Sequence, residues 1–270
     1  MEVAGDGLSL RVRDEGRGRP VLLIHGFPDS SHVWRHQIDA LTSAGMRAIA
    51  PDLRGFGESD KPAAVEDYAI AHSVADMVCV LDALGVERCH VVGHDWGAVV
   101  AWGLAALAPQ RVERLVAMSV GHPAAMGSPS IEQREKGWYR LFFQFTGVAE
   151  QLLARDDWQL MRELLRDAAD LDRYLADLSR PGALTAGLNW YRANLAPERA
   201  LDPGPPLPPV QAPTLGIWSS GDHYVTEDGM RRSGEHVTGD WRYERIEGVS
   251  HWLQLDATTR VNELLLEFLG

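Results

Sequence analysis

The chain has 270 residues, and its 26 Lys and Arg residues against 38 Asp and Glu residues give a formal net charge of −12 at pH 7. This length suits one large domain with an insertion, and the acidic balance disfavours nucleic acid as a partner. We expect no signal peptide and no membrane partner, because the first residues are acidic and polar and no apolar run is long enough to cross a bilayer. The two cysteines, Cys79 and Cys89, lie in apolar stretches and favour a reducing, cytoplasmic location without a metal site.

The first half of the chain alternates apolar runs with amphipathic stretches. We expect a half-exposed edge strand at residues 8–13, followed by buried strands at 21–24, 48–50, 89–92 and 112–119. Apolar residues at helical spacing predict helices at 33–41, 70–84 and 98–108. This order predicts an α/β protein with a mostly parallel sheet and helices on both faces. In such sheets the active site forms at the carboxyl ends of the strands.

The pattern changes in the middle of the chain. From residue 122 to about residue 201 we find helix-forming stretches and no strand pattern, and five of the fifteen prolines then fall within residues 201–209. The prolines indicate a stiff linker. Strands resume at 214–218 and 241–246, and the last helix has its apolar face between 261 and 268. We therefore predict a core domain of residues 1–121 and 210–270 and a helical cap domain of residues 122–209.

The segment Gly93-His94-Asp95-Trp96-Gly97 lies between a predicted strand and a predicted helix. Its Gly-x-Asp-x-Gly spacing is that of a nucleophile elbow, in which the middle side chain stands on a tight turn. Glycines flank that residue because a Cβ would clash with the strand or the helix. A carboxylate, with an ordinary pKa of about 3.9, is already ionised at neutral pH and needs no base. Asp95 therefore favours attack on a saturated carbon over acyl transfer.

Two later residues complete a catalytic pattern. Asp222 and His251 each follow a predicted strand, and the order Asp95, Asp222, His251 is the chain order of the α/β-hydrolase triad. We expect His251 to take a proton from water. Asp222 would hold the imidazole in one tautomer and stabilise the imidazolium.

The chain resembles the epoxide hydrolases of the α/β-hydrolase fold, close to the soluble mammalian and plant enzymes. The core motifs are His-Gly-Phe-Pro at 25–28, Gly-His-Asp-Trp-Gly at 93–97 and Ser-His-Trp at 250–252. The segments 139–150 and 188–192 resemble the two cap stretches that bear catalytic tyrosines. The resemblance runs from about residue 8 to residue 269, and it implies the α/β-hydrolase fold and hydrolysis of an epoxide to a vicinal diol. Its cap motifs are the specific part, since dehalogenases share the core motifs.

The resemblance also implies roles for individual residues. Tyr139 and Tyr191 would bind and protonate the epoxide oxygen, and the backbone N–H groups of Phe27 and Trp96 would hold the oxyanion of the second step. The peptide bond before Pro28 is expected to be cis. The reaction needs no organic cofactor and no metal. Its implied partner is a small apolar epoxide, handled by a monomer or homodimer.

Two further sets of residues are weaker candidates. An apolar substrate wall could include Trp34, Phe142, Trp190 and Trp252, which core packing would explain equally well. We also expect His94 and Asp29 to approach each other beneath the nucleophile and to order the hydrolytic water. The alternative is that His94 is a hydrogen-bonded core histidine. Asp29 stands where many relatives carry Glu, so the resemblance does not fix how this water is held.

Other functions fit parts of the pattern. A haloalkane dehalogenase uses the same Asp nucleophile but needs donors for the halide, often Asn or Trp after the His-Gly, where this chain has Phe27. Trp96 is compatible with such an enzyme, whereas the tyrosine pair favours the epoxide. A fluoroacetate dehalogenase would need arginines beside the nucleophile, where Trp96 and Val99 stand. A non-catalytic small-molecule-binding protein on the same fold is the alternative from another class.

Overall fold

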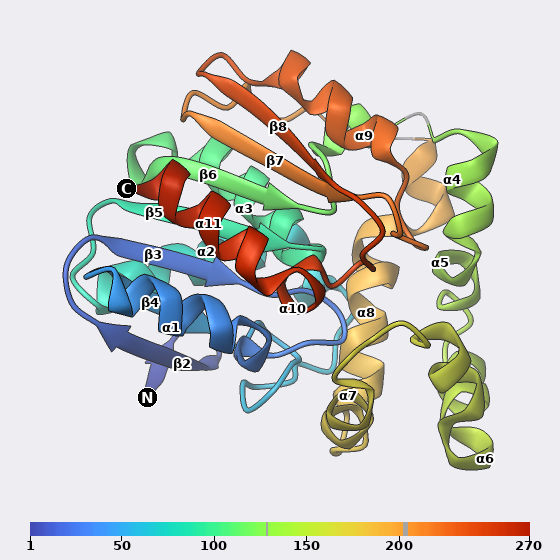
Figure 1. The fold of residues 1–270 in the computed structure, drawn as a ribbon. Coiled ribbons are helices and arrows are strands. Elements are labelled where there is room, and N and C mark those ends of the chain that lie inside the picture. Colours follow the sequence, from blue (N-terminus) through green and yellow to red (C-terminus); the bar gives the residue numbers. More distant parts are fainter. Residues whose placement is uncertain (128, 202–204) are drawn as a thin grey trace.

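The computed structural model describes residues 1–127, 129–201 and 205–270, and its strands form one sheet (Figure 1). The order across the sheet is β1-β2-β4-β3-β5-β6-β7-β8. β2 runs antiparallel to β1 and β4, and every neighbouring pair from β4 to β8 is parallel. The strands are β1 (Glu2–Ala4), β2 (Ser9–Gly16), β3 (Pro20–Ile24), β4 (Arg47–Pro51), β5 (Cys89–His94), β6 (Val112–Met118), β7 (Thr214–Ser219) and β8 (Trp241–Ile246). The predicted α/β class and mostly parallel sheet are confirmed.

Helices cover both faces of this sheet. α1 and α11 pack together on one face, and α2 and α3 pack together on the other (Figure 1). α3 is buried on nearly every side because it lies directly against β5 and β6. This packing places the turn between β5 and α3 at the middle of the sheet. Outside the segment between β6 and β7, the α-helices are α1 (Arg35–Ser43), α2 (Ile70–Ala83), α3 (Trp96–Leu107), α9 (Glu227–Arg232), α10 (Leu253–Asp256) and α11 (Thr258–Leu269).

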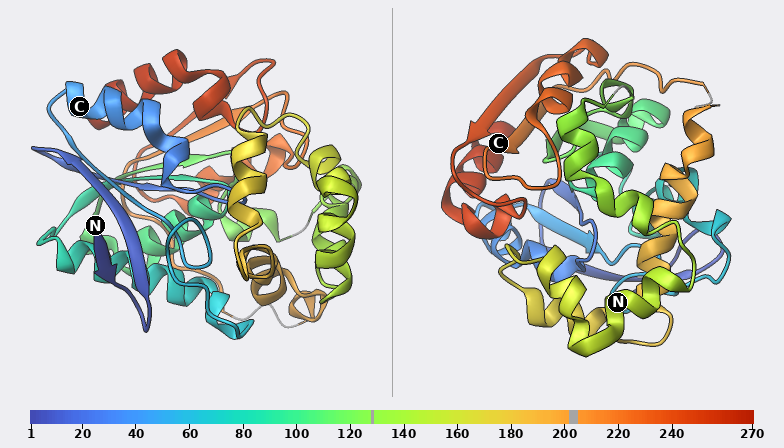
Figure 2. Two further views of the ribbon diagram at one scale, coloured as in Figure 1. Left: turned by 90° about the horizontal axis from the view of Figure 1, so that it is seen from below. Right: turned by 90° about the vertical axis from the view of Figure 1, so that its right-hand side faces the viewer.

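A group of helices lies between β6 and β7 in the chain and beside the carboxyl ends of the strands (Figure 2). They are α4 (Ile131–Lys136), α5 (Trp138–Phe142), α6 (Val148–Leu164), α7 (Leu171–Leu178) and α8 (Ala183–Leu195). No strand occurs in this segment among the residues that the structure describes, as predicted. The predicted linker at 201–209 includes residues 202–204, which lie outside the described residues.

A buried polar contact fixes α8 on the sheet layer. Trp190 is fully buried, and its indole Nε1 donates a hydrogen bond of 3.0 Å to the backbone oxygen of Arg54. Arg54 follows β4 and forms a buried ion pair with Asp76 of α2, with 2.7 Å between Nε and Oδ2. An indole N–H that is buried needs an acceptor, so this contact sets both the depth and the rotation of α8. The same helix carries Tyr191.

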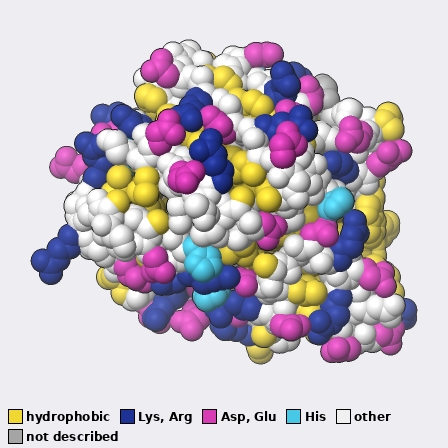
Figure 3. Space-filling view, viewed as in Figure 1, with side chains coloured by type: hydrophobic (Ala, Val, Ile, Leu, Met, Phe, Trp, Pro, Cys, Tyr) yellow, Lys and Arg dark blue, Asp and Glu magenta, His cyan; other side chains and the backbone are white. Residues whose placement is uncertain are grey.

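The molecular surface mixes charges of both signs. On the face of Figure 3, Lys and Arg side chains lie among Asp and Glu side chains and do not form a basic stripe. None of the described helices has the length and apolar character that a membrane span requires.

Candidate active site

Asp95 stands on a strained turn between β5 and α3. Its backbone has φ 53° and ψ −122°, a conformation that residues with a Cβ rarely adopt. The glycines on both sides permit this turn by close backbone approach. A Cβ on Gly93 would meet the carbonyl oxygen of Gly97, and a Cβ on Gly97 would meet that of Ile24. The geometry is that of the predicted elbow, with the carboxylate presented at the carboxyl end of the central strand.

The Asp95 carboxylate is held by hydrogen-bond donors on one side. The backbone N–H of Phe27 donates to Oδ1 at 2.8 Å, and the backbone N–H of Trp96 also favours the ionised form. Burial alone would raise the pKa of Asp95, but His251 and the Trp96 amide outweigh it, so the pKa lies below its usual range. The peptide bond between Phe27 and Pro28 is cis, as expected. The side chain of Asp95 is 14% exposed, so a small molecule can approach its other oxygen.

His251 lies between two carboxylates. Its Nδ1 donates to Oδ2 of Asp222 at 2.7 Å, and its Nε2 is 3.5 Å from Oδ2 of Asp95. Asp222 is fixed in turn, because the backbone N–H groups of Tyr224 and Val225 donate to its Oδ1 at 2.8 and 2.9 Å. Burial disfavours a charge on His251, but the two carboxylates outweigh burial and raise its pKa to about 10. The free site therefore holds an imidazolium at neutral pH.

The structure brings His94 and Asp29 close together without a hydrogen bond between them. His94 Nε2 donates to the backbone oxygen of His251 at 2.9 Å, and His94 Nδ1 lies 3.2 Å from the amide nitrogen of Gln254. Asp29 Oδ2 is 4.0 Å from that Nδ1 and 3.3 Å from Nε1 of Trp252. Burial lowers the pKa of His94 to about 3, so its ring is neutral. His94 is thus a hydrogen-bonded core histidine that also supports the backbone of His251.

Tyr139 of α5 and Tyr191 of α8 lie together near Asp95. Their ring centroids are 5.8 Å apart, and the Tyr191 ring stands edge-on to the rings of Trp96 at 5.1 Å and Phe27 at 5.5 Å. Both tyrosines are buried, and burial raises the pKa of each hydroxyl, with the Asp95 carboxylate adding to the effect. Both phenols are therefore protonated at neutral pH and can donate hydrogen bonds.

The four proposed wall residues occupy different places. Trp190 packs against Trp96 with 5.7 Å between ring centroids, and Trp252 packs against His251 at 5.3 Å. Phe142 is half-buried on the outer side of α5, with its ring 6.1 Å from that of Phe143. Trp34 is fully buried, and among the described residues we find no ring contact between it and this cluster. Trp190 and Trp252 therefore pack against residues of the site, whereas within the described residues neither Phe142 nor Trp34 has a ring contact with Trp96 or His251.

Two aromatic residues at the site were not predicted. The ring of Phe143 lies 4.9 Å from that of Tyr191 and 6.0 Å from that of Phe27. Phe143 comes four residues after Tyr139, so helical spacing could have placed both on one face. The ring of Tyr224 lies 5.2 Å from that of His251. The conformation of the loop after β7 sets this contact, and no periodic pattern marks it.

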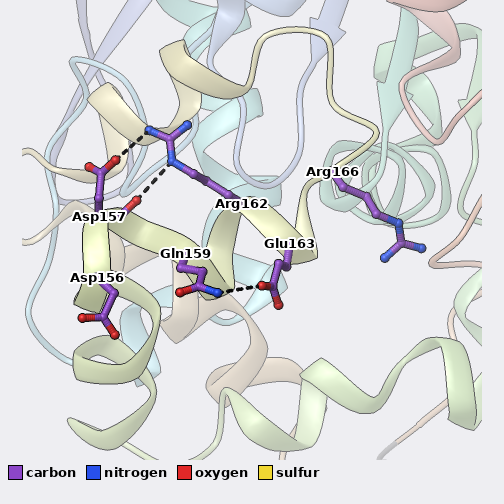
Figure 4. Close-up of a pocket in the computed structure, with 6 residues that line it drawn as sticks. All are labelled: Asp156, Asp157, Gln159, Arg162, Glu163 and Arg166. Carbon is purple, nitrogen blue, oxygen red and sulfur yellow. Dashed lines mark hydrogen bonds and ion pairs between the residues drawn. The ribbon is translucent and has the colours of Figure 1, made fainter.

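Among the hollows on the described surface, one lies between the helices that follow β6 and the loop after β7, and another lies on α6. The smaller, with a volume of about 290 Å³, includes Tyr139 and Tyr224 in its wall and so reaches the site. The larger, of about 670 Å³, is lined by charged and amide side chains of α6 and by Arg166 beyond the end of that helix (Figure 4). We place the candidate active site at the smaller hollow, because no lining residue of the larger hollow belongs to the cluster around Asp95.

Nowhere in residues 1–127, 129–201 and 205–270 do three His, Cys, Asp or Glu side chains gather as a metal site would require.

Comparison with known proteins agrees with this geometry. Residues 19–258 match the family described as alpha/beta hydrolase fold. The chain is 36% identical to epoxide hydrolase A of Mycobacterium tuberculosis, over 98% of this chain and 95% of that protein. It is 34% identical to epoxide hydrolase 3 of Xenopus tropicalis, over 96% of this chain and 77% of that protein.

A solved structure gives the same result in three dimensions. The structure of the Bacillus megaterium epoxide hydrolase in complex with an inhibitor superposes with a TM-score of 0.90 at 29% identity, over 100% of this chain and 99% of that one. Fold, family match and relatives therefore agree. The chain is a hydrolase of the α/β-hydrolase fold and belongs to the epoxide hydrolase family.

Proposed function

We propose that this chain converts an epoxide to a vicinal diol through a covalent alkyl ester on Asp95. The observation that carries the proposal is that two buried phenols, from α5 and α8, lie near the ionised carboxylate of Asp95, whose charge raises the pKa of both. A carboxylate nucleophile needs no base, and the leaving oxygen of an epoxide needs acids. We assign these roles to Asp95, Tyr139 and Tyr191.

The first step forms the ester. Oδ2 of Asp95 attacks one epoxide carbon, the bond between that carbon and the ring oxygen breaks, and its electron pair remains on the oxygen. That oxygen takes a proton from one of the tyrosines, while the other tyrosine donates a hydrogen bond. Oδ1 of Asp95 already accepts the backbone N–H of Phe27 and becomes the ester carbonyl oxygen in the same place. The donors therefore stand ready for the second step.

The second step returns the carboxylate. The imidazolium of His251 passes its proton to the phenolate left by the first step, and the neutral imidazole then accepts a proton from water as the water attacks the ester carbonyl. The N–H groups of Phe27 and Trp96 hold the oxyanion. As it collapses, the bond between the carbonyl carbon and the alkyl oxygen breaks, and the departing oxygen takes from His251 the proton that came from water, which releases the diol and leaves His251 neutral. The Asp95 carboxyl formed in this way gives its proton to His251 and restores the first state. Loss of the Asp95 charge in the ester weakens the hold of His251 on its proton, which makes the transfer favourable.

The neighbouring groups would assist these steps. Asp222 orients His251. The His94 ring lies 4.7 Å from that of His251, and we propose that His94 and Asp29 help to order the water. Trp190 and Trp252 offer apolar surface to a small epoxide. We also propose that residues 122–209 act as a cap domain over a core of residues 1–121 and 210–270, because α5 and α8 bring the phenols to the strand ends.

A substrate panel tests the proposal. Purified protein is incubated with aryl and alkyl epoxides and with halogenated alkanes, and diol and halide are measured. We expect diol from at least one epoxide and no halide. Halide release without diol would make the chain a dehalogenase, and binding without either product would make it a non-catalytic binding protein.

A further inference from the structure

Each of the two site tyrosines is followed by an arginine, and the two arginines are in different environments. Arg192, after Tyr191, is neutralised by Glu150, with hydrogen bonds of 2.7 and 3.0 Å to the two carboxylate oxygens. It also donates to the backbone oxygen of Phe143 at 2.9 Å. This arginine is a structural link between α8 and α6, with its charge balanced where it stands.

Arg140, after Tyr139, has no such partner. Its Nε is buried and makes no hydrogen bond within the described part of the chain, and no carboxylate of these residues lies within ion-pair distance of its guanidinium. The guanidinium carbon lies over the Tyr139 ring, 5.8 Å from the centroid. A Cβ on Gly137 would come within 3.2 Å of the Arg140 Nε, so the glycine gives this side chain its room. A cation that is partly removed from water without a counterion is costly, which indicates that its charge is used.

The groups around Tyr139 shift the pKa of its hydroxyl in opposite directions. Burial raises the pKa of the Tyr139 hydroxyl, and Asp95 at the elbow and Asp222 after β7 raise it further. Arg140 is the one neighbouring group that lowers it, and it acts on Tyr139 more strongly than on Tyr191. A phenol that gives up its proton becomes an anion, and a nearby guanidinium stabilises that anion.

We propose that Arg140 is a positioning residue whose unpaired guanidinium makes Tyr139, rather than Tyr191, the tyrosine that gives its proton to the epoxide oxygen. This inference rests on the proposed function and assigns unequal roles within the tyrosine pair. As the ring opens, the negative charge that begins on Asp95 moves to the epoxide oxygen and, once the proton is transferred, to the Tyr139 oxygen. Arg140 lies over the ring that carries this oxygen, whereas the cation that follows Tyr191, Arg192, is neutralised by Glu150.

Single-turnover alkylation with styrene oxide, followed by rapid quench and intact-mass measurement, tests the inference. The variants are Arg140→Met, Arg140→Lys, Tyr139→Phe and the double variant Arg140→Met with Tyr139→Phe. Arg134→Met removes an exposed cation from neighbouring α4 and is the control. The substrate concentration that gives half the maximal rate is measured for each, and thermal unfolding checks that each variant is folded.

We expect Arg140→Met to slow alkylation about three- to tenfold, because a weaker acid is a poorer proton donor, with little change in the half-saturating concentration. Arg140→Lys should restore most of the rate, since it keeps the charge. In the Tyr139→Phe background, Arg140→Met should change the rate less than about twofold, because the donor is already absent.

Other results would overturn the inference. An unchanged rate in Arg140→Met, an equal loss in both backgrounds, or failure of Lys to rescue a folded protein would show that Arg140 does not act through Tyr139. A defect confined to epoxides that carry a carboxylate would make Arg140 a substrate-binding residue instead. If the unmodified protein formed neither adduct nor diol, the proposed function itself would fail, a result distinct from any of these.

Discussion

At the scale of single residues, the tyrosine pair serves only the first of the two proposed steps. The oxygen that leaves the epoxide carbon would otherwise be an alkoxide, whereas an ordinary phenol has a pKa of about 10 and can donate to it while remaining protonated at neutral pH. Each charge-assisted hydrogen bond contributes roughly 1.5–3 kcal/mol, or about ten- to a hundredfold in rate. The hydrolysis of an ester that has already formed needs His251, Asp222 and the backbone donors instead.

We therefore predict that Tyr139→Phe and Tyr191→Phe each slow alkylation of Asp95, and that the double variant nearly abolishes it. Single-turnover kinetics separates adduct formation from adduct decay, and the decay rate should change little. If both single variants alkylate at the unmodified rate, the tyrosines are packing residues. A dehalogenase would then become the better interpretation.

Asp29 gives a prediction about pH and stability. Burial raises its pKa to about 8, against the opposing effects of Tyr174, Trp252 and His251, while the charge on Asp95 adds to the rise. Because the folded protein favours the protonated carboxyl, this stabilisation is present at pH 4 and is lost as the pH rises through 8. The Asp29→Asn side chain resembles the protonated carboxyl. The unfolding free energy of this variant minus that of the wild-type protein should therefore increase from pH 5 to pH 8.5, by up to roughly 4 kcal/mol.

Denaturant unfolding at the two pH values measures this difference. Asp39→Asn, at an exposed position of α1, is the control and should show no such change. An equal effect of both substitutions would mean that Asp29 is ionised in the folded protein at neutral pH.

At the scale of elements, α2 and α8 hold the loop after β4 between them. Asp76 of α2 is fully buried and bonds Arg54 at 2.7 and 2.9 Å, and the backbone oxygen of Arg54 accepts the Trp190 indole of α8. The pair links a helix on one face of the sheet to the helix that carries Tyr191. Removing one partner of a buried pair leaves an uncompensated charge, which is more costly than the pair itself is stabilising.

Asp76→Ala should thus lower the unfolding free energy by about 3–5 kcal/mol. Asp82→Ala on the same helix is the matched control, because Asp82 is 63% exposed where it pairs with Arg111, and its loss should cost less than about 1 kcal/mol. Equal losses of unfolding free energy in the two variants, measured by urea unfolding, would show that the buried pair stabilises the fold no more than the exposed pair does.

Elements with a strong periodic pattern were predictable from the sequence. β5 and its neighbours are continuous apolar runs, and the elbow followed from two glycines around Asp95. β1 was missed because three residues give no period, and Tyr224 was missed because loop geometry alone brings it to His251. The unpaired state of Arg140 was equally invisible, since it depends on which carboxylates lie near it in space.

At the scale of the whole molecule, the proposed reaction divides its two steps between two layers. The nucleophile, the base and the oxyanion donors belong to loops at the carboxyl ends of β3, β5, β7 and β8, whereas the acids for ring opening come from α5 and α8. A variant that blocks only the second step should leave the first step running. The covalent ester on Asp95 would then accumulate.

The most direct test is intact-mass measurement of His251→Gln after addition of an aryl epoxide such as styrene oxide. We predict a protein heavier by one substrate molecule, with the added mass on the peptide that contains Asp95, because ring opening needs no base and ester hydrolysis does. Asp95→Asn is the control and should remain unmodified when it is assayed promptly. A folded His251→Gln protein that gains no mass, while the wild-type enzyme produces diol, would contradict the covalent mechanism.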